Sequence, residues 1–169
     1  MAPFLIFSAP TKAHAEVLRY ARAMKEDLPV GGKLGVAGFC WGGYGSTNLC
    51  MDAVSEGSDV PLINAQFNAH PSFLKTPDMI VGAITKYKVP YSSAVAEKDF
   101  MLGAKSAEET EAAIRQKVGS SDEYKYEFRI HKGCNHGFGV RADLDNPAAE
   151  KGYQEAARQA VDWFNKYLN

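Results

Sequence analysis

Hydrophobic and polar positions follow two different periods along this chain, and each period predicts a different kind of element. Apolar side chains recur three and four positions apart in some segments, as on one face of a helix. Other segments are short and mostly apolar, as in buried strands. The predicted strands are 33–38, 61–67, 89–96 and 126–131, and the predicted helices are 12–27, 41–54, 104–118 and a final helix capped by Asn146 and opened by Pro147.

The order of these segments predicts the fold class. From residue 33 onward, strands and helices alternate, which is typical of a parallel sheet with right-handed crossovers and helices packed on its faces. A length of 169 residues fits one domain. We therefore expect residues 1–169 to form a single α/β domain with about four to five strands.

The segment Gly38-Phe39-Cys40-Trp41-Gly42-Gly43 follows the first predicted strand where the chain turns into a helix. It has the G-x-nucleophile-x-G pattern of a nucleophile elbow, with a thiol in place of the usual hydroxyl. Glycine is favoured beside the apex because the apex backbone is strained and flanking side chains would clash with the neighbouring strand and helix. The N-terminal dipole of the helix favours a thiolate at Cys40. A Gly-rich turn with a buried cysteine also occurs in α/β proteins without this chemistry.

Two polar side chains follow later predicted strands in an order that matches the elbow. Asp99 comes after the third strand and His136 after the fourth, and nucleophile, acid and histidine take this order in folds with such an elbow. Carboxyl ends of parallel strands meet at one edge of a sheet, so we expect both side chains beside Cys40. The acid would orient the imidazole, which would take the thiol proton. Alternatively, Asp99 caps a helix, Glu97 is the acid, or His136 is a hydrogen-bonded loop residue.

Four motifs together resemble those of the dienelactone hydrolase family in the α/β-hydrolase superfamily, and in particular of its fungal members: Gly38-Phe39-Cys40-Trp41-Gly42-Gly43, His70-Pro71-Ser72, Glu97-Lys98-Asp99 and His136-Gly137-Phe138. The resemblance covers about the whole chain, with the motifs in order. It implies that Cys40 is the nucleophile, Asp99 the acid and His136 the base. It also implies hydrolysis of small lactones or esters without a metal or organic cofactor.

Further residues flank this predicted site. The backbone N–H of Trp41, directly after the nucleophile, would donate to an oxyanion. Phe39, His70 and Phe138 are candidates for contact with the substrate, although each could instead be a packing residue. Cys134 lies two residues from His136 and could be a redox partner of Cys40 or a small residue that fills a loop.

The resemblance also implies that an N-terminal part of the family fold is missing. Longer members place several strands and a helix before the elbow strand, so we expect an α/β-hydrolase fold truncated on its N-terminal side. The missing part would supply a second oxyanion donor, a glutamate that holds the resting thiol and an arginine for a substrate carboxylate. Hydrolysis would therefore be slow. Residues 33–38 would form an exposed edge strand, which residues 3–7 could cover, and which favours a homodimer.

Composition narrows the setting and the partners. A net charge of −1, from 19 basic and 20 acidic side chains, argues against nucleic acid or an anionic membrane surface as a partner. The apolar run at residues 1–7 lacks a basic flank and is too short for a signal peptide or a membrane span. Three cysteines without metal-site spacing suit a reducing compartment, so we expect a cytoplasmic protein. Besides a hydrolase, a catalytically impaired binding or assembly module and a thiol redox sensor stay open.

Overall fold

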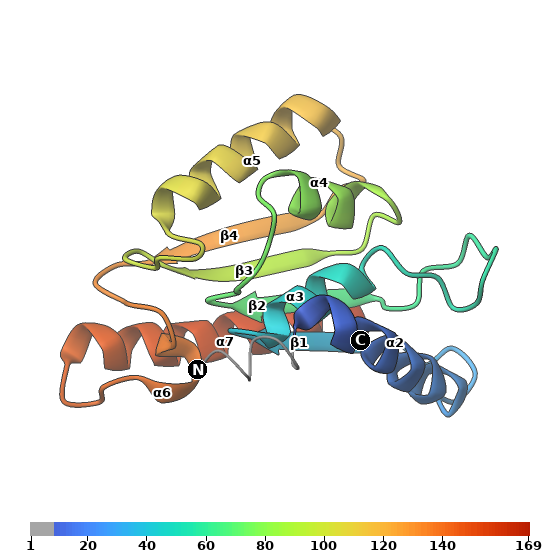
Figure 1. Cartoon of the computed structure of the whole chain (residues 1–169), viewed down its shortest axis with the longest axis horizontal. Coiled ribbons are helices and arrows are strands. Elements are labelled where there is room, and N and C mark those ends of the chain that lie inside the picture. The colour runs from blue at the N-terminus through green and yellow to red at the C-terminus, as the bar shows by residue number, and fades with distance from the viewer. Residues whose placement is uncertain (1–8) are drawn as a thin grey trace.

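A parallel sheet of four strands forms the centre of the molecule (Figure 1). The computed structural model describes residues 9–169. Each strand pairs in parallel with the next one along the chain, so the spatial order is the sequence order. The strands are β1 (Gly35–Phe39), β2 (Ala65–Ala69), β3 (Tyr91–Ala96) and β4 (Tyr126–His131). The predicted α/β class with a parallel sheet is confirmed.

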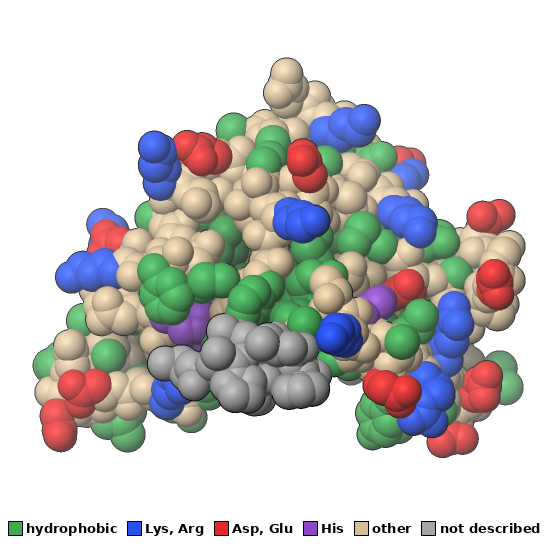
Figure 2. Space-filling view, in the orientation of Figure 1, with side chains coloured by type: hydrophobic (Ala, Val, Ile, Leu, Met, Phe, Trp, Pro, Cys, Tyr) green, Lys and Arg blue, Asp and Glu red, His purple; other side chains and the backbone are tan. Residues whose placement is uncertain are grey.

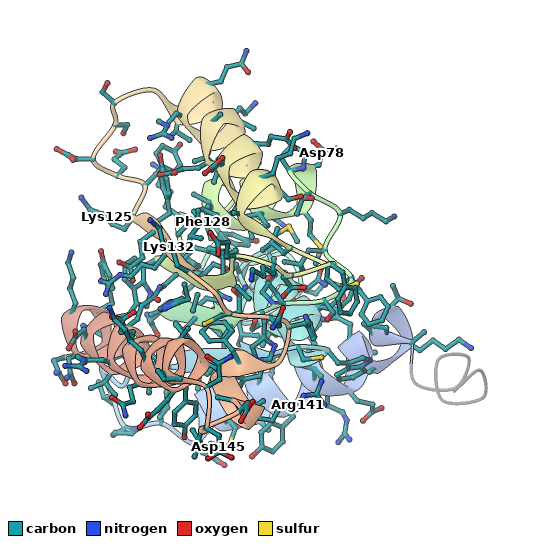
Figure 3. The ribbon with its side chains drawn as sticks, turned by 90° about the vertical axis from the view of Figure 1, so that its left-hand side faces the viewer. Asp78, Lys125, Phe128, Lys132, Arg141 and Asp145 are labelled. Carbon is teal, nitrogen blue, oxygen red and sulfur yellow. The ribbon has the colours of Figure 1, made fainter. Side chains whose placement is uncertain are left out.

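Helices cover both faces of this sheet (Figures 1 and 3). Successive side chains of a strand point to opposite faces. Val95 of β3 therefore belongs to one core cluster with Ile84 and Ile114, whereas the adjacent Ala94 belongs to a second cluster with Ala156 of the last helix. The helices are α2 (Pro10–Glu26), α3 (Gly42–Leu49), α4 (Asp78–Thr85), α5 (Ala104–Val118), α6 (Phe138–Arg141) and α7 (Pro147–Leu168).

The second strand lies later in the chain than predicted. Leu62 and Ile63 are buried but belong to a loop, and the strand itself carries Gln66 and Asn68, both fully buried. Polar groups in this position need partners. The Asn68 amide donates to the Tyr91 hydroxyl at 2.8 Å and accepts from the Ser93 hydroxyl at 2.7 Å. A prediction from hydrophobicity alone therefore starts this strand too early, in the apolar loop that precedes it.

Two helices were not predicted, and one is shorter than predicted. Helix α4 has the sequence Asp-Met-Ile-Val-Gly-Ala-Ile-Thr, which lacks the polar face that marks an amphipathic helix. Helix α6 has four residues and follows Gly137, whose φ of +96° is left-handed. The helix after the elbow ends at Leu49 rather than at residue 54. The cap of α7 is as predicted, because the Asn146 side chain accepts hydrogen bonds from the first turn.

Strand β1 lies at one end of the sheet, as predicted. Among residues 9–169, β2 is its only strand partner. A groove beside it is lined by apolar side chains of α2, β1 and neighbouring segments, among them Val17, Tyr20, Met24 and Val36. The predicted covering strand at residues 3–7 lies outside the described residues.

None of the helices between residues 10 and 168 combines the length and the apolar character needed to cross a bilayer. The surface carries both signs of charge, with Lys and Arg side chains interspersed among Asp and Glu over the face in Figure 2. Lys125, Phe128 and Lys132, on β4 and its two flanks, are labelled in Figure 3.

Candidate active site

Cys40 lies at the turn between β1 and α3 with a left-handed backbone, at a φ of +51°. This is the strained apex that the sequence predicts, and such strain persists only where the surroundings enforce it. The N–H of Cys40 donates to the carbonyl of Ala69 at 3.2 Å. Its own carbonyl accepts from Gly43 at 3.0 Å and from Ser72 at 2.9 Å. The end of β2 and the start of α3 together fix the position of the thiol.

The glycines of the elbow differ in how crowded they are. A Cβ at Gly38 would overlap Ser46 Oγ and lie 2.5 Å from the carbonyl oxygen of Gly42. A Cβ at Gly43 would overlap Pro71 and lie 2.7 Å from its Cα. At Gly42 a Cβ would meet nothing within 4 Å. The predicted crowding is therefore present at Gly38 and Gly43, but the prediction was wrong for Gly42.

Three side chains from three loops form a hydrogen-bonded chain. Nε2 of His136 lies 3.1 Å from Sγ of Cys40, and Nδ1 lies 2.9 Å from each carboxylate oxygen of Asp99. The Asp99 side chain is fully buried and also accepts the N–H of Met101 at 2.8 Å. Asp99 therefore ends the turn after β3 and contacts the imidazole at the same time. The predicted contacts among these three side chains are present.

Glu97, the second candidate acid, has another partner. Its carboxylate accepts the backbone N–H of Gly133 at 2.8 Å. The N–H of Lys98 also donates to the carbonyl of Cys134 at 3.0 Å. These two bonds join the loop after β3 to the loop after β4, which carries His136. Glu97 thus positions the loop and does not contact the imidazole.

The surroundings lower the pKa of the Cys40 thiol and raise the pKa of the His136 imidazole. Burial favours the neutral thiol, but hydrogen bonds with His136 and Ser72, the charge of His136 and the N–H of Trp41 lower the pKa of Cys40 below its ordinary value. Burial also favours the neutral imidazole, but hydrogen bonds with Cys40 and Asp99 and their charges raise the pKa of His136. These shifts favour a thiolate paired with an imidazolium.

Two residues at the site were not predicted to belong to it. The hydroxyl of Ser72 lies 3.6 Å from Sγ of Cys40 and 3.5 Å from Nε2 of His136. Phe100 is 81% exposed, and its ring centroid lies 5.1 Å from that of His136. Ser72 follows β2 at the same edge of the sheet, and Phe100 directly follows the acid, so the edge rule that located Asp99 could have found both.

The three residues predicted to contact substrate differ in exposure. Phe39 is 38% exposed, Phe138 is 3% exposed and His70 is fully buried. The His70 ring centroid lies 5.1 Å from that of His136, 6.3 Å from Phe39 and 5.7 Å from Phe138. Sγ of Cys40 and a ring nitrogen of each of these two histidines lie within 4.8 Å of one another. Phe39 thus reaches the surface, while His70 and Phe138 lie beneath it. Figure 2 shows a histidine side chain at the surface among hydrophobic side chains.

The other two cysteines have core environments. Cys50 is fully buried, donates to the carbonyl of Ser46 at 3.5 Å, and has a pKa that burial and the charge of Asp52 raise. Cys134 is also fully buried, and its thiol donates to the carbonyl of Ala148 in α7 at 3.5 Å. Burial likewise raises the pKa of Cys134. All three cysteines are free thiols, and Cys40 is the one whose pKa is lowered.

Comparison with known proteins identifies the family. The family model of the dienelactone hydrolases matches residues 6–168. The chain belongs to the dienelactone hydrolase family. It is 31% identical to hydrolase tropI of Talaromyces stipitatus over 137 residues, which are 80% of this chain and 46% of tropI. It is 27% identical to the human carboxymethylenebutenolidase homolog over 138 residues, which are 80% of this chain and 49% of that protein. The chain thus spans about half the length of these curated relatives.

Solved structures agree with this family assignment in their fold. A dienelactone hydrolase homologue from Klebsiella pneumoniae superposes with a TM-score of 0.68 at 17% identity, over 98% of this chain and 67% of its own. An acetyl ester-xyloside bifunctional hydrolase from Caldicellulosiruptor lactoaceticus gives 0.62 at 14% identity, over 90% and 65% of the two chains. The four strands and their helices thus form part of an α/β-hydrolase fold.

Proposed function

We propose that this dienelactone hydrolase family member hydrolyses small lactones and esters with Cys40 as nucleophile, His136 as base and Asp99 as the acid that orients the base. The observation that carries the proposal is the hydrogen-bonded chain from the thiol through the imidazole to the carboxylate. Its three members have the roles of nucleophile, base and orienting group in the general triad arrangement. No metal or organic cofactor takes part in the proposed reaction.

The proposed reaction has two steps. The Cys40 thiolate attacks the carbonyl carbon of the substrate, and the C–O bond to the leaving alcohol breaks while Nε2–H of His136 protonates that oxygen. This leaves an acyl thioester on Cys40. Nε2 then takes a proton from a water molecule, whose oxygen attacks the thioester and releases the acid. The thiolate and the imidazolium form again, and Asp99 keeps the imidazole oriented through both steps.

The oxyanion that forms in each step needs hydrogen-bond donors. We assign one donor to the N–H of Trp41, which already donates toward the Cys40 sulfur and contributes to its lowered pKa. The family resemblance implies that a second donor comes from the part of the fold before the elbow strand, and these 169 residues span about half the length of the curated relatives. Removing one oxyanion donor costs about 10²–10³ in rate in a well-studied protease. We therefore expect slow hydrolysis by the 169-residue chain. Phe39 and Phe100, both exposed beside the site, are the proposed contacts for the apolar part of the substrate.

Hydrolysis of a chromogenic acyl ester tests the proposed function. Cys40→Ala should reduce the rate to the uncatalysed background, and the wild type should lose activity after thiol alkylation. Cys50→Ala is the matched control, because its thiol is fully buried and away from the imidazole. It should keep the wild-type rate. Activity that survives Cys40→Ala, or that is absent from the folded wild type, would contradict the proposal and favour a binding or assembly module.

We also propose that two chains associate through the β1 edge. Unpaired N–H and C=O groups on an edge strand recruit another strand, and Tyr20, beside the apolar groove next to β1, is 68% exposed. A stable homodimer would bury about 1,000 Å² or more in total.

Free thiols at all three cysteines fit a reducing, cytoplasmic setting.

Sedimentation at micromolar concentration tests the dimer. Ala37 is exposed on β1, so Ala37→Lys should place a charge at the interface and yield a monomer. Ala112→Lys, at an exposed position of α5, is the matched control and should stay dimeric. A well-behaved wild-type monomer would refute the dimer.

A further inference from the structure

His70 is a buried imidazole that makes no hydrogen bond within the described part of the chain. It is fully buried, and neither ring nitrogen has a partner among residues 9–169. The other buried histidine, His131, has a partner in Gln159 at 3.3 Å. Leaving a buried polar group unpaired costs about 1–3 kcal/mol, so such a group calls for an explanation. The backbone of His70 is also left-handed, with a φ of +40°, and such strain gathers at functional sites.

Two side chains beside His70, those of Cys40 and His136, are of types that bind metal ions. A ring nitrogen of His70, a ring nitrogen of His136 and Sγ of Cys40 lie within 4.8 Å of one another. Thiolate and neutral imidazole are the preferred ligands of Zn²⁺, at about 2.3 Å for sulfur and 2.0–2.1 Å for nitrogen. Such lengths separate neighbouring ligand atoms of a tetrahedron by roughly 3.3–3.6 Å. The 3.1 Å between Sγ and Nε2 of His136 is shorter than this range, so these two side chains would move apart by a few tenths of an ångström around the ion.

The groups around these three ligands also fit a metal ion. Asp99 holds Nδ1 of His136 at 2.9 Å, which is the carboxylate–histidine arrangement that orients metal-bound imidazoles. The Ser72 hydroxyl lies 3.6 Å from Sγ and 3.5 Å from Nε2 of His136, where it can hydrogen-bond a water bound as the fourth ligand. Cys40 and His136 are partly exposed, so an ion can enter from solvent.

The charge of the ligands favours metal binding as well. A metal ion binds the thiolate and the neutral imidazole, so its binding releases protons from the ligands. Arg141 is a positive charge that acts on His70, and the buried Asp99 carboxylate is a negative charge that offsets it. One carboxylate and one thiolate beside a single cation favour a divalent metal ion.

We propose that Cys40, His70 and His136 form a binding site for Zn²⁺ that, when occupied, reversibly blocks the thiol. The Sγ–Zn and Nε2–Zn bonds form as the one proton that Cys40 and His136 share, which Nε2 carries in the thiolate–imidazolium pair, passes to solvent. No electrons are exchanged. Metal binding itself does not depend on the proposed hydrolase function. Only the expected inhibition of ester hydrolysis by the bound metal rests on that function.

Cobalt serves as the spectroscopic probe, because a thiolate bound to Co²⁺ gives a near-ultraviolet charge-transfer band and tetrahedral Co²⁺ absorbs in the visible. The wild type titrated with Co²⁺ should show both, and Zn²⁺ should displace them. Cys40→Ala should lose the charge-transfer band. His70→Asn, which tolerates the left-handed backbone, and His70→Phe, which keeps the ring volume, should each bind at least about 10–100-fold more weakly, the loss seen for outer partners alone. His14→Asn is the control and should bind like the wild type.

The proposal is overturned if the wild type gives no thiolate–cobalt band, or if a folded His70 variant binds Co²⁺ as tightly as the wild type. The wild-type spectrum decides even where a variant fails to fold. Ester hydrolysis measured with a chelator present keeps the two proposals apart. Metal binding without hydrolysis would support this metal site and contradict the proposed hydrolase function. Hydrolysis without metal binding would support the hydrolase function and contradict the metal site.

Discussion

Gly38→Ala tests whether close contact between β1 and α3 holds the elbow in place. The added Cβ would overlap Ser46 Oγ and lie 2.5 Å and 2.8 Å from the carbonyl oxygen and carbon of Gly42. The serine hydroxyl could rotate away, but the backbone of Gly42 can move only if α3 shifts. Ser46 Oγ also accepts the amide of Gln66 at 3.2 Å and donates to the carbonyl of Gly43 at 3.2 Å, so its rotation breaks buried hydrogen bonds.

These contacts set the size of the expected effect. Overpacking in a well-packed core costs about 1–3 kcal/mol, and we expect about 2–3 kcal/mol because backbone atoms are involved. In a domain of this length each kcal/mol lowers Tm by about 2–4 °C, so Tm should fall by roughly 4–12 °C. The shift of α3 should also move Cys40 away from His136 and slow alkylation of the thiol.

Gly42→Ala is the matched control for this substitution. Its Cβ would meet nothing within 4 Å, and Gly42 begins α3, where alanine is favoured over glycine by up to about 1 kcal/mol. Its Tm should be unchanged or higher. Thermal unfolding followed by circular dichroism measures both variants. A Gly38→Ala protein with the wild-type Tm, or an equal fall for Gly42→Ala, would refute the packing argument.

The remaining predictions concern the proposed catalytic groups. Asp99→Asn should keep the fold and lower the rate of ester hydrolysis by up to about 10⁴-fold, the loss seen for the corresponding change in a serine protease; an unchanged rate would remove Asp99 from the mechanism. Because its neighbours lower the pKa of Cys40, the thiolate should form at lower pH than in a free cysteine, and the rate of iodoacetamide alkylation should reach its midpoint at a lower pH than that of a free cysteine measured alongside. His136→Gln removes the group that lowers the pKa of Cys40 most, so the midpoint should move to higher pH. A midpoint that does not move argues against the thiolate–imidazolium pair. Limiting iodoacetamide should modify Cys40 before Cys50, whose pKa is raised by burial, and the opposite order would exclude the elbow thiol as the reactive one.

The sequence predicted those features of the candidate site that depend on local pattern and on strand order. The elbow is local, because glycines and a cysteine after an apolar run set the backbone that places Cys40 at a φ of +51°. Asp99 and His136 follow from topology, since parallel strands bring their carboxyl ends to one edge. Strand order predicts only that the three side chains share this edge, and in the structure His136 is within hydrogen-bonding distance of both Cys40 and Asp99.

Other features depend on packing between distant segments and were less accessible. The burial of His70 and its lack of a partner depend on Phe39 and Phe138, which come from two other loops. Helix α4 has a polar side chain only at its two ends, Asp78 and Thr85, so the sequence between them shows no helical period. The polar pair Gln66 and Asn68 sits inside β2 only because side chains from α3 and β3 supply hydrogen bonds, and nothing in the local pattern reveals that.

The most direct test of the proposed mechanism is the detection of the acyl thioester. The wild type is mixed with an excess of a chromogenic acetyl ester, quenched in acid and digested, and the acetylated residue is identified by mass spectrometry. We predict one acetyl group on Cys40, formed as fast as the first turnover, and none in Cys40→Ala. An acetyl group found instead on Ser72, Cys50 or Cys134, or turnover without any acetylation of Cys40, would contradict the assignment of the nucleophile.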